Sequence, residues 1–335
     1  MLAVGLDLTV LSVALPTLAR SLHASASDLQ WFWSGYLLVL AAAMLPAGLL
    51  GDRYGRRRVM LAALALFSAG SVACASAPSF GAFIAARVLL GLSGAGVIVM
   101  SLSALTVLFS EQERPKAVGI WAAANFLGAP IGPILGGFLL THYWWGWVFL
   151  INVPVALIGL IAAYALVPES RAHQQPGLDP VGVAASVAGL LALTYGLIGT
   201  GRDGWGDAGA LLAMIAGVAV LVGFVAWERR LGRRPGGQPL VDLTLFGSPS
   251  YTWGVILVAI AVLAMSGVLF TMPQYFQAVM GTDAMGSGVR LLPPIGGLVV
   301  GALPAAAIAR LIRAKVAVAL GFTVLTAGLR LSEVS

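Results

Sequence analysis

A basic, glycine-rich stretch decides the fold: Gly48-Leu49-Leu50-Gly51-Asp52-Arg53-Tyr54-Gly55-Arg56-Arg57-Arg58. It joins two apolar segments, residues 30–51 and 59–77. A helix needs about 20 residues to cross a bilayer core of about 30 Å, and both segments reach that length. Glycines allow a tight turn, and the arginines keep the turn at the membrane surface. The stretch therefore predicts two antiparallel membrane helices joined by a short basic loop.

Apolar segments of this kind recur along the whole chain of 335 residues. Charged residues make up only 10% of the chain, against about 25% in an average globular protein, and 59% of the residues are hydrophobic. The mean hydropathy is +0.96. Backbone polar groups in lipid must pair within their own segment, which favours helices. We expect an all-α polytopic membrane protein with about eleven spans, at residues 1–21, 30–51, 59–77, 81–108, 117–140, 145–167, 181–199, 209–227, 251–275, 288–309 and 316–330.

The distribution of basic residues predicts the orientation of these spans. With the N-terminus in the cytoplasm, the inside loops hold fourteen Lys and Arg, whereas the outside loops hold only Arg20, Arg202 and Arg290. Such a bias is the positive-inside pattern of membrane proteins. We therefore predict a multi-pass protein of the cell membrane with a cytoplasmic N-terminus.

Several other classes of function lack the residues they would need. A single cysteine, Cys74, and three histidines offer no metal set, and no glycine-rich loop ends in Gly-Lys-Ser/Thr. The basic residues that give the net charge of +6 lie between apolar segments, and aromatic residues do not alternate with them as they do on a nucleic-acid surface. We expect no cofactor, no metal, no nucleic-acid partner and no enzyme activity, because no catalytic set of side chains is recognisable.

Two charges, Asp7 and Arg87, fall inside predicted spans. A charge facing lipid at mid-depth costs about 3 kcal/mol or more, so both are expected to face a wet passage. A carboxylate at Asp7 can bind a proton or a cationic substrate. The alternatives are an interfacial acid near a helix end for Asp7, and for Arg87 a structural tie to backbone carbonyls or to a partner acid.

Two glycine-rich motifs predict moving parts. In the loop, Asp52 among arginines can dock against neighbouring helix ends as a latch that opens during transport, or the loop can be a plain basic anchor. The latch residues are Gly48, Asp52, Arg53, Gly55, Arg56 and Arg57. In the span 117–140, glycines spaced by four allow close helix packing and the prolines bend the helix. The residues of this second motif are Gly119, Gly128, Gly132, Pro133, Gly136 and Gly137. Generic packing of small residues is the alternative for most of them.

Aromatic residues cluster at the predicted outer ends of the spans, as in an interfacial belt. Tyr36, Trp121 and Asn125 are set further in. These three are candidates to line a pocket for flat or cationic ligands.

With these motifs in place, the sequence resembles the fourteen-span drug/proton antiporter branch of the major facilitator superfamily. The matching motifs are Leu6–Pro16, Gly48–Arg58, Arg87–Gly91, Gly119–Gly137, Trp145–Pro154 and Pro239–Phe246. Ser12 stands where the family commonly has Asn, and Leu90 replaces the usual Gln. The resemblance implies a proton-coupling role for Arg87, an antiporter helix at Gly119–Gly137, and three missing C-terminal spans.

The resemblance predicts the domain organisation and the function. We expect an N-terminal six-helix half at 1–167, two inserted helices with flanking loops at 168–247, and an incomplete C-terminal half at 248–335. The predicted function is proton-coupled export of amphipathic cationic or aromatic compounds, by a protein expected to be monomeric, with the small molecule, protons and the bilayer as partners. The alternatives are a dedicated exporter of a self-made metabolite or antibiotic, and an inactive remnant or non-transporting membrane protein.

Overall fold

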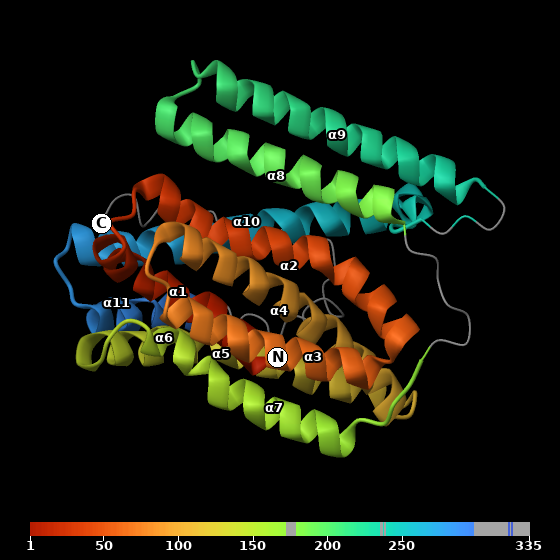
Figure 1. Cartoon of the computed structure of the whole chain (residues 1–335), viewed down its shortest axis with the longest axis horizontal. Coiled ribbons are helices and arrows are strands. Elements are labelled where there is room, and N and C mark those ends of the chain that lie inside the picture. Colours follow the sequence, from red (N-terminus) through yellow and green to blue (C-terminus); the bar gives the residue numbers. More distant parts are fainter. Residues whose placement is uncertain (172–178, 235–236, 238, 298–320, 322, 324–335) are drawn as a thin grey trace. The chain divides into compact units, whose positions relative to one another are not determined.

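The computed structural model describes residues 1–171, 179–234, 237, 239–297, 321 and 323. These residues form α-helices and one short 3₁₀ helix, and no strand occurs among them. The elements are α1 (Leu2–Ser21), α2 (Ala26–Tyr54), α3 (Arg56–Ala75), α4 (Phe80–Leu108), α5 (Arg114–His142), α6 (Trp147–Leu150), α7 (Asn152–Leu166), α8 (Pro180–Asp203), α9 (Ala208–Gly232), η1 (Leu243–Gly247), α10 (Pro249–Ala278) and α11 (Ala284–Arg290). Figure 1 labels them along the chain.

Eight helical segments of the described chain are long and apolar enough to cross a membrane. They are α1, α2, α3, α4, α8, α9, α10 and the segment Trp147–Leu166, which combines α6 and α7. Helix α5 coincides with the predicted span 117–140 but is not among the eight. Nearly all of the predicted span 316–330 and most of 288–309 lie outside the described residues. The helical membrane architecture is confirmed, and the count of eleven stays a prediction.

Local sequence signals explain where the helices begin and end. Ser25 and Asp28 form a capping box at the start of α2, in which each side chain bonds the other residue's backbone N–H. Pro180 and Pro249 occupy the first turns of α8 and α10, where a missing N–H does no harm. Gly55 separates α2 from α3 with φ of +110°, a conformation that favours glycine.

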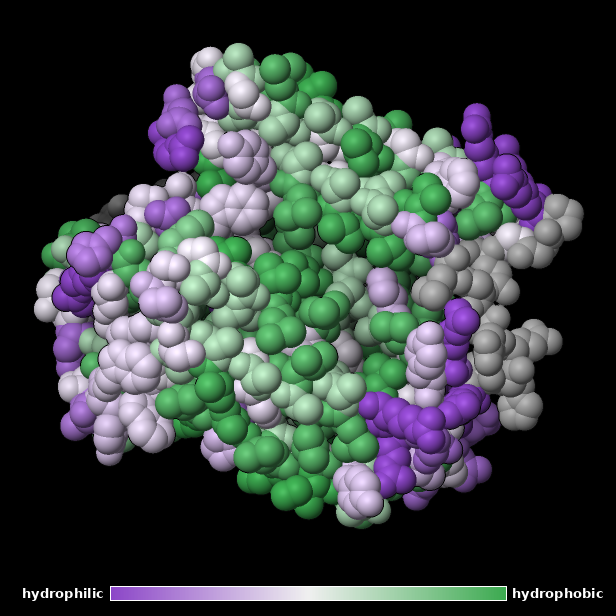
Figure 2. All heavy atoms as spheres, in the orientation of Figure 1, coloured by the Kyte–Doolittle hydropathy of each residue, from purple (hydrophilic) through white to green (hydrophobic). Residues whose placement is uncertain are grey.

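The chain divides into two compact units, Met1–Val289 and Arg290–Ser335. Within the first unit, α1 packs against α5 and α10, α2 against α4 and α8, and α3 against α4 and α7. Helix α1 is the most enclosed span, with 72% of its apolar window buried, whereas the window of α10 is 0% buried. Figure 2 shows apolar side chains across much of the visible face, with hydrophilic ones gathered near its margins. Such an exposed apolar surface suits contact with lipid.

Helices α8 and α9 run side by side as a hairpin (Figure 1). Close approach depends on glycines: a Cβ added at Gly196 would overlap Met214, and one at Gly217 would overlap Leu193. At one end, buried Glu228 accepts a hydrogen bond from the Val241 N–H at 3.0 Å, which ties α9 to the segment before η1. This hairpin contains the two spans that the sequence predicts as an insertion, and the proposed domain limits remain a prediction.

Candidate functional site

A buried ion pair joins α1 to α4. The Arg87 Nη1 atom donates to Asp7 Oδ2 at 2.7 Å, and the two side chains are 0% and 1% exposed. Isolated charges are very costly in an apolar interior, and a hydrogen-bonded pair offsets part of that penalty. The sequence predicts that both charges face a wet passage. In this structure that expectation is wrong, because each charge faces the other and both are closed off from solvent.

Further donors and acceptors complete the surroundings of the pair. The Asn152 Nδ2 atom of α7 donates to Asp7 Oδ1 at 3.1 Å. The Arg87 Nε atom donates to the backbone carbonyl of Phe32 on α2 at 3.2 Å. The guanidinium carbon of Arg87 lies 4.2 Å from the centre of the Tyr36 ring, a cation–π contact. Arg87 therefore bonds both a backbone carbonyl and a partner acid, which are the two structural roles that the sequence leaves open for it.

Four helices therefore converge on one polar cluster, which we call the charge cluster: Asp7, Arg87, Asn152 and Tyr36. Aromatic rings enclose the helix ends beside it, with ring centres of Phe32 and Phe83 4.5 Å apart. Spacing in the sequence gives no signal for this convergence, because Asn152 lies 145 residues from Asp7. Asn152 lies within the motif Trp145–Pro154, which does not predict its contact with Asp7.

The charge cluster has unused hydrogen-bonding capacity. Within the described part of the chain, Arg87 Nη2, Asn152 Oδ1 and the Tyr36 hydroxyl are buried without a partner. Buried polar atoms are nearly always paired, so three unpaired atoms at one point are unusual. The cluster can accept a changed hydrogen-bonding pattern without first breaking every existing bond.

The basic loop makes ordered contacts at the α2–α3 turn. The Arg56 Nε and Nη2 atoms donate to Asp52 Oδ1 at 3.1 and 2.9 Å, one helical turn apart. The guanidinium carbon of Arg53 lies 5.6 Å from the Tyr54 ring centre. A Cβ at Gly48 would meet Val99 of α4 at an ordinary 3.6 Å. Among the described residues, Asp52 thus pairs within the α2–α3 turn and not with a distant helix.

The arginines and Gly55 dock this turn on the residues at and after the end of α7. The Arg57 side chain donates to the Tyr164 carbonyl at 2.5 Å, and the Arg56 N–H donates to the Ser170 carbonyl at 3.0 Å. Glu169 accepts from the Arg57 N–H at 3.3 Å and pairs with Arg58 at 3.5 Å. Glu169 lies in no motif of the sequence, so its role in this contact was not predicted.

Glycines on α5 allow close contact with α1. A Cβ at Gly128 would lie 2.7 Å from the Gly5 carbonyl carbon, and one at Gly132 would overlap the Thr9 hydroxyl. The Thr9 hydroxyl in turn donates to the Gly128 carbonyl at 2.8 Å. A Cβ at Gly136 would meet Val10 at 3.3 Å. The predicted close packing on one glycine face is confirmed for these three positions.

The remaining residues of the α5 motif lie elsewhere. A Cβ at Gly137 would lie 2.7 Å from the Met285 Cα of α11, and one at Gly288 would overlap the Pro133 carbonyl. In the part of the chain that the structure describes, no atom lies within 4 Å of a Cβ added at Gly119. Gly119 therefore takes no part in the packing seam, which we define as Gly128, Gly132 and Gly136 against α1.

The three predicted pocket residues make different contacts. Tyr36 is fully buried beneath Arg87. The Trp121 indole N–H donates to the Ser101 hydroxyl of α4 at 2.9 Å. The Asn125 side-chain and backbone oxygens lie against Gly5 of α1.

Among the residues that the structure describes, no group of three or more His, Cys, Asp or Glu could hold a metal ion.

Comparison with protein families gives one match across nearly the whole chain. The model of the Major Facilitator Superfamily matches residues 1–332. Among solved structures, the proton:xylose symporter XylE bound to 6-bromo-6-deoxy-D-glucose is similar, with a TM-score of 0.56 and 18% identity over 91% of this chain and 66% of that chain. An auto-inhibited POT family peptide transporter gives a TM-score of 0.59 at 15% identity, over 93% of this chain and 68% of that chain. At these identities the likeness shows the fold alone.

Relatives at higher identity carry names of export proteins. The chain is 37% identical over 300 residues to the tetracenomycin C resistance and export protein of Streptomyces glaucescens, covering 89% of this chain and 55% of the relative. It is 37% identical over 302 residues to the probable actinorhodin transporter of Streptomyces coelicolor, covering 89% and 52%. It is 35% identical over 296 residues to the multidrug efflux pump LfrA of Mycolicibacterium smegmatis, covering 87% and 57%. The chain thus spans about half the length of these relatives.

Proposed function

The chain belongs to the major facilitator superfamily, a family of membrane transporters, and we propose that it exports amphipathic cationic or aromatic compounds in exchange for protons. The names of the relatives support export of drugs or antibiotics. The charge cluster supports the proton coupling, and it is the observation on which this proposal depends. Membrane insertion with a cytoplasmic N-terminus, fourteen spans in the complete protein and a monomeric state are part of the same proposal.

Protonation of Asp7 is the proposed coupling event. The carboxylate holds Arg87 of α4 and Asn152 of α7 to α1, with both side-chain oxygens engaged. A proton on Asp7 removes the charge attraction and turns one acceptor into a donor. Asn152 Oδ1, which is buried without a described partner, can accept from that new donor after rotation of the amide. The contacts between α1, α4 and α7 therefore depend on the proton.

The loop contacts support a latch at the predicted cytoplasmic side. The α2–α3 turn is held to the end of α7 by Arg57 and by Glu169, through backbone and side-chain bonds. These groups are partly exposed, and each exposed ion pair contributes about 1 kcal/mol or less. Weak contacts of this kind can break and re-form during a transport cycle. Asp52, Arg53 and Arg56 shape the turn in this proposal.

The packing seam is the proposed sliding surface between α5 and α1. The α5 backbone meets the α1 backbone at Gly128 and the Thr9 side chain at Gly132. Because α5 itself contributes no side chain at these two positions, it can shift along α1 with few side-chain rearrangements. We propose the half-buried Trp121 and Asn125 of the same helix as substrate contacts. The buried Tyr36 would act through Arg87 and not on the substrate directly.

A dedicated exporter of one metabolite is the second candidate. Two of the relatives at 37% identity are named for single compounds, tetracenomycin C and actinorhodin. The same charge cluster would serve that function. A panel of unrelated dyes separates the two: a multidrug pump moves several of them, and a dedicated exporter moves none.

Everted membrane vesicles that contain the protein test the proposal. Cells producing it should yield vesicles that accumulate ethidium, a cationic aromatic dye, and release it when the imposed pH gradient is collapsed. Asp7→Asn should abolish the accumulation, while Glu111→Gln, which changes an acid that is 89% exposed, should not. Proton coupling would be refuted if ethidium accumulation changed neither on collapse of the pH gradient nor in Asp7→Asn. Normal insertion without any flux would favour a non-transporting membrane protein.

A further inference from the structure

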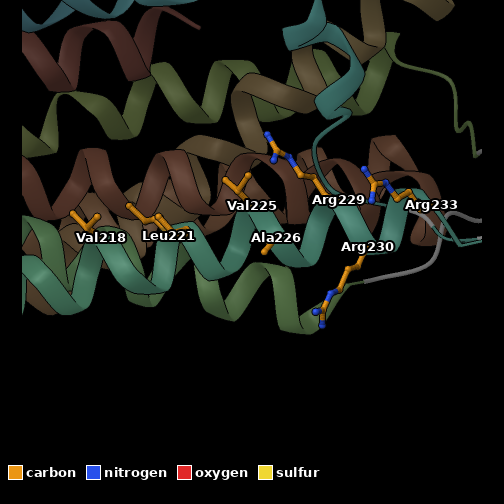
Figure 3. A pocket seen from close by; sticks show the side chains of 8 residues that line it. Val218, Leu221, Val225, Ala226, Arg229, Arg230 and Arg233 are labelled. Atoms are coloured by element: carbon orange, nitrogen blue, oxygen red, sulfur yellow. The ribbon is translucent and has the colours of Figure 1, made fainter.

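Beyond transport, the outer face of α9 carries a groove that changes from apolar to basic along the helix. The groove has a volume of about 570 Å³ and is lined by Val218, Leu221, Val222, Val225, Ala226, Arg229, Arg230 and Arg233. Figure 3 shows Val218, Leu221 and Val225 on the same side of α9 as Arg229, with Arg233 one turn further on. We call this surface the α9 groove.

Most of the α9 groove lies outside the face that packs on α8, and the two meet at Leu221, which lies next to Gly189 of α8. The α8-facing positions of α9 include Met214 and Gly217, which contact Gly196 and Leu193. Val218 and Val222, by contrast, are 50% and 63% exposed. Exposed aliphatic side chains on a membrane helix are suited to acyl chains and not to water.

The length of the apolar part fits one leaflet. Val218 and Arg229 are eleven residues apart, which corresponds to a rise of about 16 Å along a helix. Half of a hydrocarbon core of about 30 Å is nearly the same length. With the arginines at the level of the lipid headgroups, the valines therefore reach the middle of the bilayer.

The basic end has no acid to balance it among the described residues. Arg229, Arg230 and Arg233 make no ion pair there, and all three are exposed. The neighbouring acid, Glu228, is buried and turned toward the Val241 N–H. Guanidinium groups bind phosphate oxygens well, often in bidentate fashion. Three uncompensated positive charges favour a headgroup with a net negative charge.

From this geometry we propose that the α9 groove binds an anionic phospholipid of the phosphatidylglycerol type. One acyl chain lies along Val218, Val222 and Val225, and the headgroup phosphate lies between Arg229 and Arg233. These two arginines are one helical turn apart on the groove side, whereas Arg230 extends to the other side of α9 in Figure 3. The lipid would hold the α8–α9 hairpin at a fixed depth, whether or not the chain transports anything.

Lipid retention by the purified protein tests this inference. Protein reconstituted with equal amounts of phosphatidylglycerol and phosphatidylcholine is extracted in mild detergent, and its bound lipids are identified by mass spectrometry. We expect enrichment of phosphatidylglycerol, and a fall in that enrichment of about thirtyfold in Arg229→Gln/Arg233→Gln, the scale of two arginine–headgroup contacts. The matched control is Arg171→Gln/Arg234→Gln, which removes the same number of positive charges from two exposed positions that do not line the α9 groove, and it should keep most of the enrichment.

Two further arms identify the ligand and its location. A phosphatidylglycerol with a photoreactive acyl chain should label residues 218–226 of the unmodified protein. This experiment does not depend on the folding of any variant. Inorganic phosphate at high concentration should not displace the lipid. Equal loss in both double variants, labelling confined to other helices, or displacement by inorganic phosphate would each overturn the proposal.

Discussion

The carboxylate of Asp7 and the guanidinium of Arg87, 80 residues apart in the sequence, lie 2.7 Å from each other in the interior of the helical bundle. Neither side chain is more than 1% exposed. The pair connects α1, the most enclosed span, to α4, and Asn152 extends the connection to α7. A change at Asp7 therefore affects the contacts of three helices at once.

Removing one member of the pair should destabilise the protein strongly. Asp7→Asn leaves the buried Arg87 without a counter-charge, and breaking a buried pair in this way costs about 3–5 kcal/mol. Denaturant unfolding in detergent measures the change. Asp7→Asn/Arg87→Gln, which leaves neither charge, should lose less than the two single variants together. Strictly additive losses would show that the two charges do not interact.

Asn152 should make stability depend on pH when it becomes an acid. Asn152→Asp places a second carboxylate beside Asp7, and only one arginine is present to balance the two. Protonation of one carboxyl relieves the repulsion, so this variant should unfold at a lower temperature as pH rises from 5 to 8. Asn152→Leu, which only removes a donor, should cost about 1–3 kcal/mol without that slope. Parallel pH profiles for the two variants would contradict the assignment.

Two glycines of α5 should respond differently to the same substitution. In Gly132→Ala the new methyl group overlaps Thr9, and overpacking of this kind costs about 1–3 kcal/mol. Gly119→Ala meets nothing within 4 Å and should be neutral or gain up to about 1 kcal/mol from helix propensity. Thermal unfolding of both variants in detergent gives the comparison. Equal behaviour would mean that α5 does not touch α1 at Gly132.

The turn between α2 and α3 should require Gly55. Its φ of +110° is strained for any other residue, which costs about 1–3 kcal/mol, and an added methyl group would also meet the Glu169 carboxylate. Gly55→Ala should therefore lower the unfolding temperature. Gly81→Ala, at an open helical position with an ordinary φ, is the control and should not. If both variants unfold together, the docking of the turn on Glu169 is not part of the native structure.

The sequence predicted the helical spans well because their signal is local. Length and apolar composition place α1 through α4 and α8 through α10 within a few residues, and the Gly55 turn follows from its motif. The spacing of Gly128, Gly132 and Gly136 also predicted a close helix contact, although it did not identify α1 as the partner.

The site was harder to predict because its contacts are not local. Asp7 and Arg87 were recognised separately as costly intramembrane charges, but no spacing rule shows that they pair. Glu169 lies in no motif, and the motif that contains Asn152 does not show what it contacts, since the roles of both residues arise from tertiary contacts with Arg57 and Asp7. A buried charge predicts that its desolvation cost is compensated. It does not show whether water or another side chain provides the compensation.

Proton release on substrate binding is the most direct test of whether Asp7 is the residue that couples export to protons. Purified protein in weakly buffered detergent, with a pH-indicator dye, is mixed with ethidium, and the protons released are counted. We expect ethidium to displace protons from those molecules of the unmodified protein and of Glu111→Gln in which Asp7 is protonated and no longer paired with Arg87. Asp7→Asn should bind ethidium without releasing any. Proton release of the same size from Asp7→Asn would contradict Asp7 as the coupling residue.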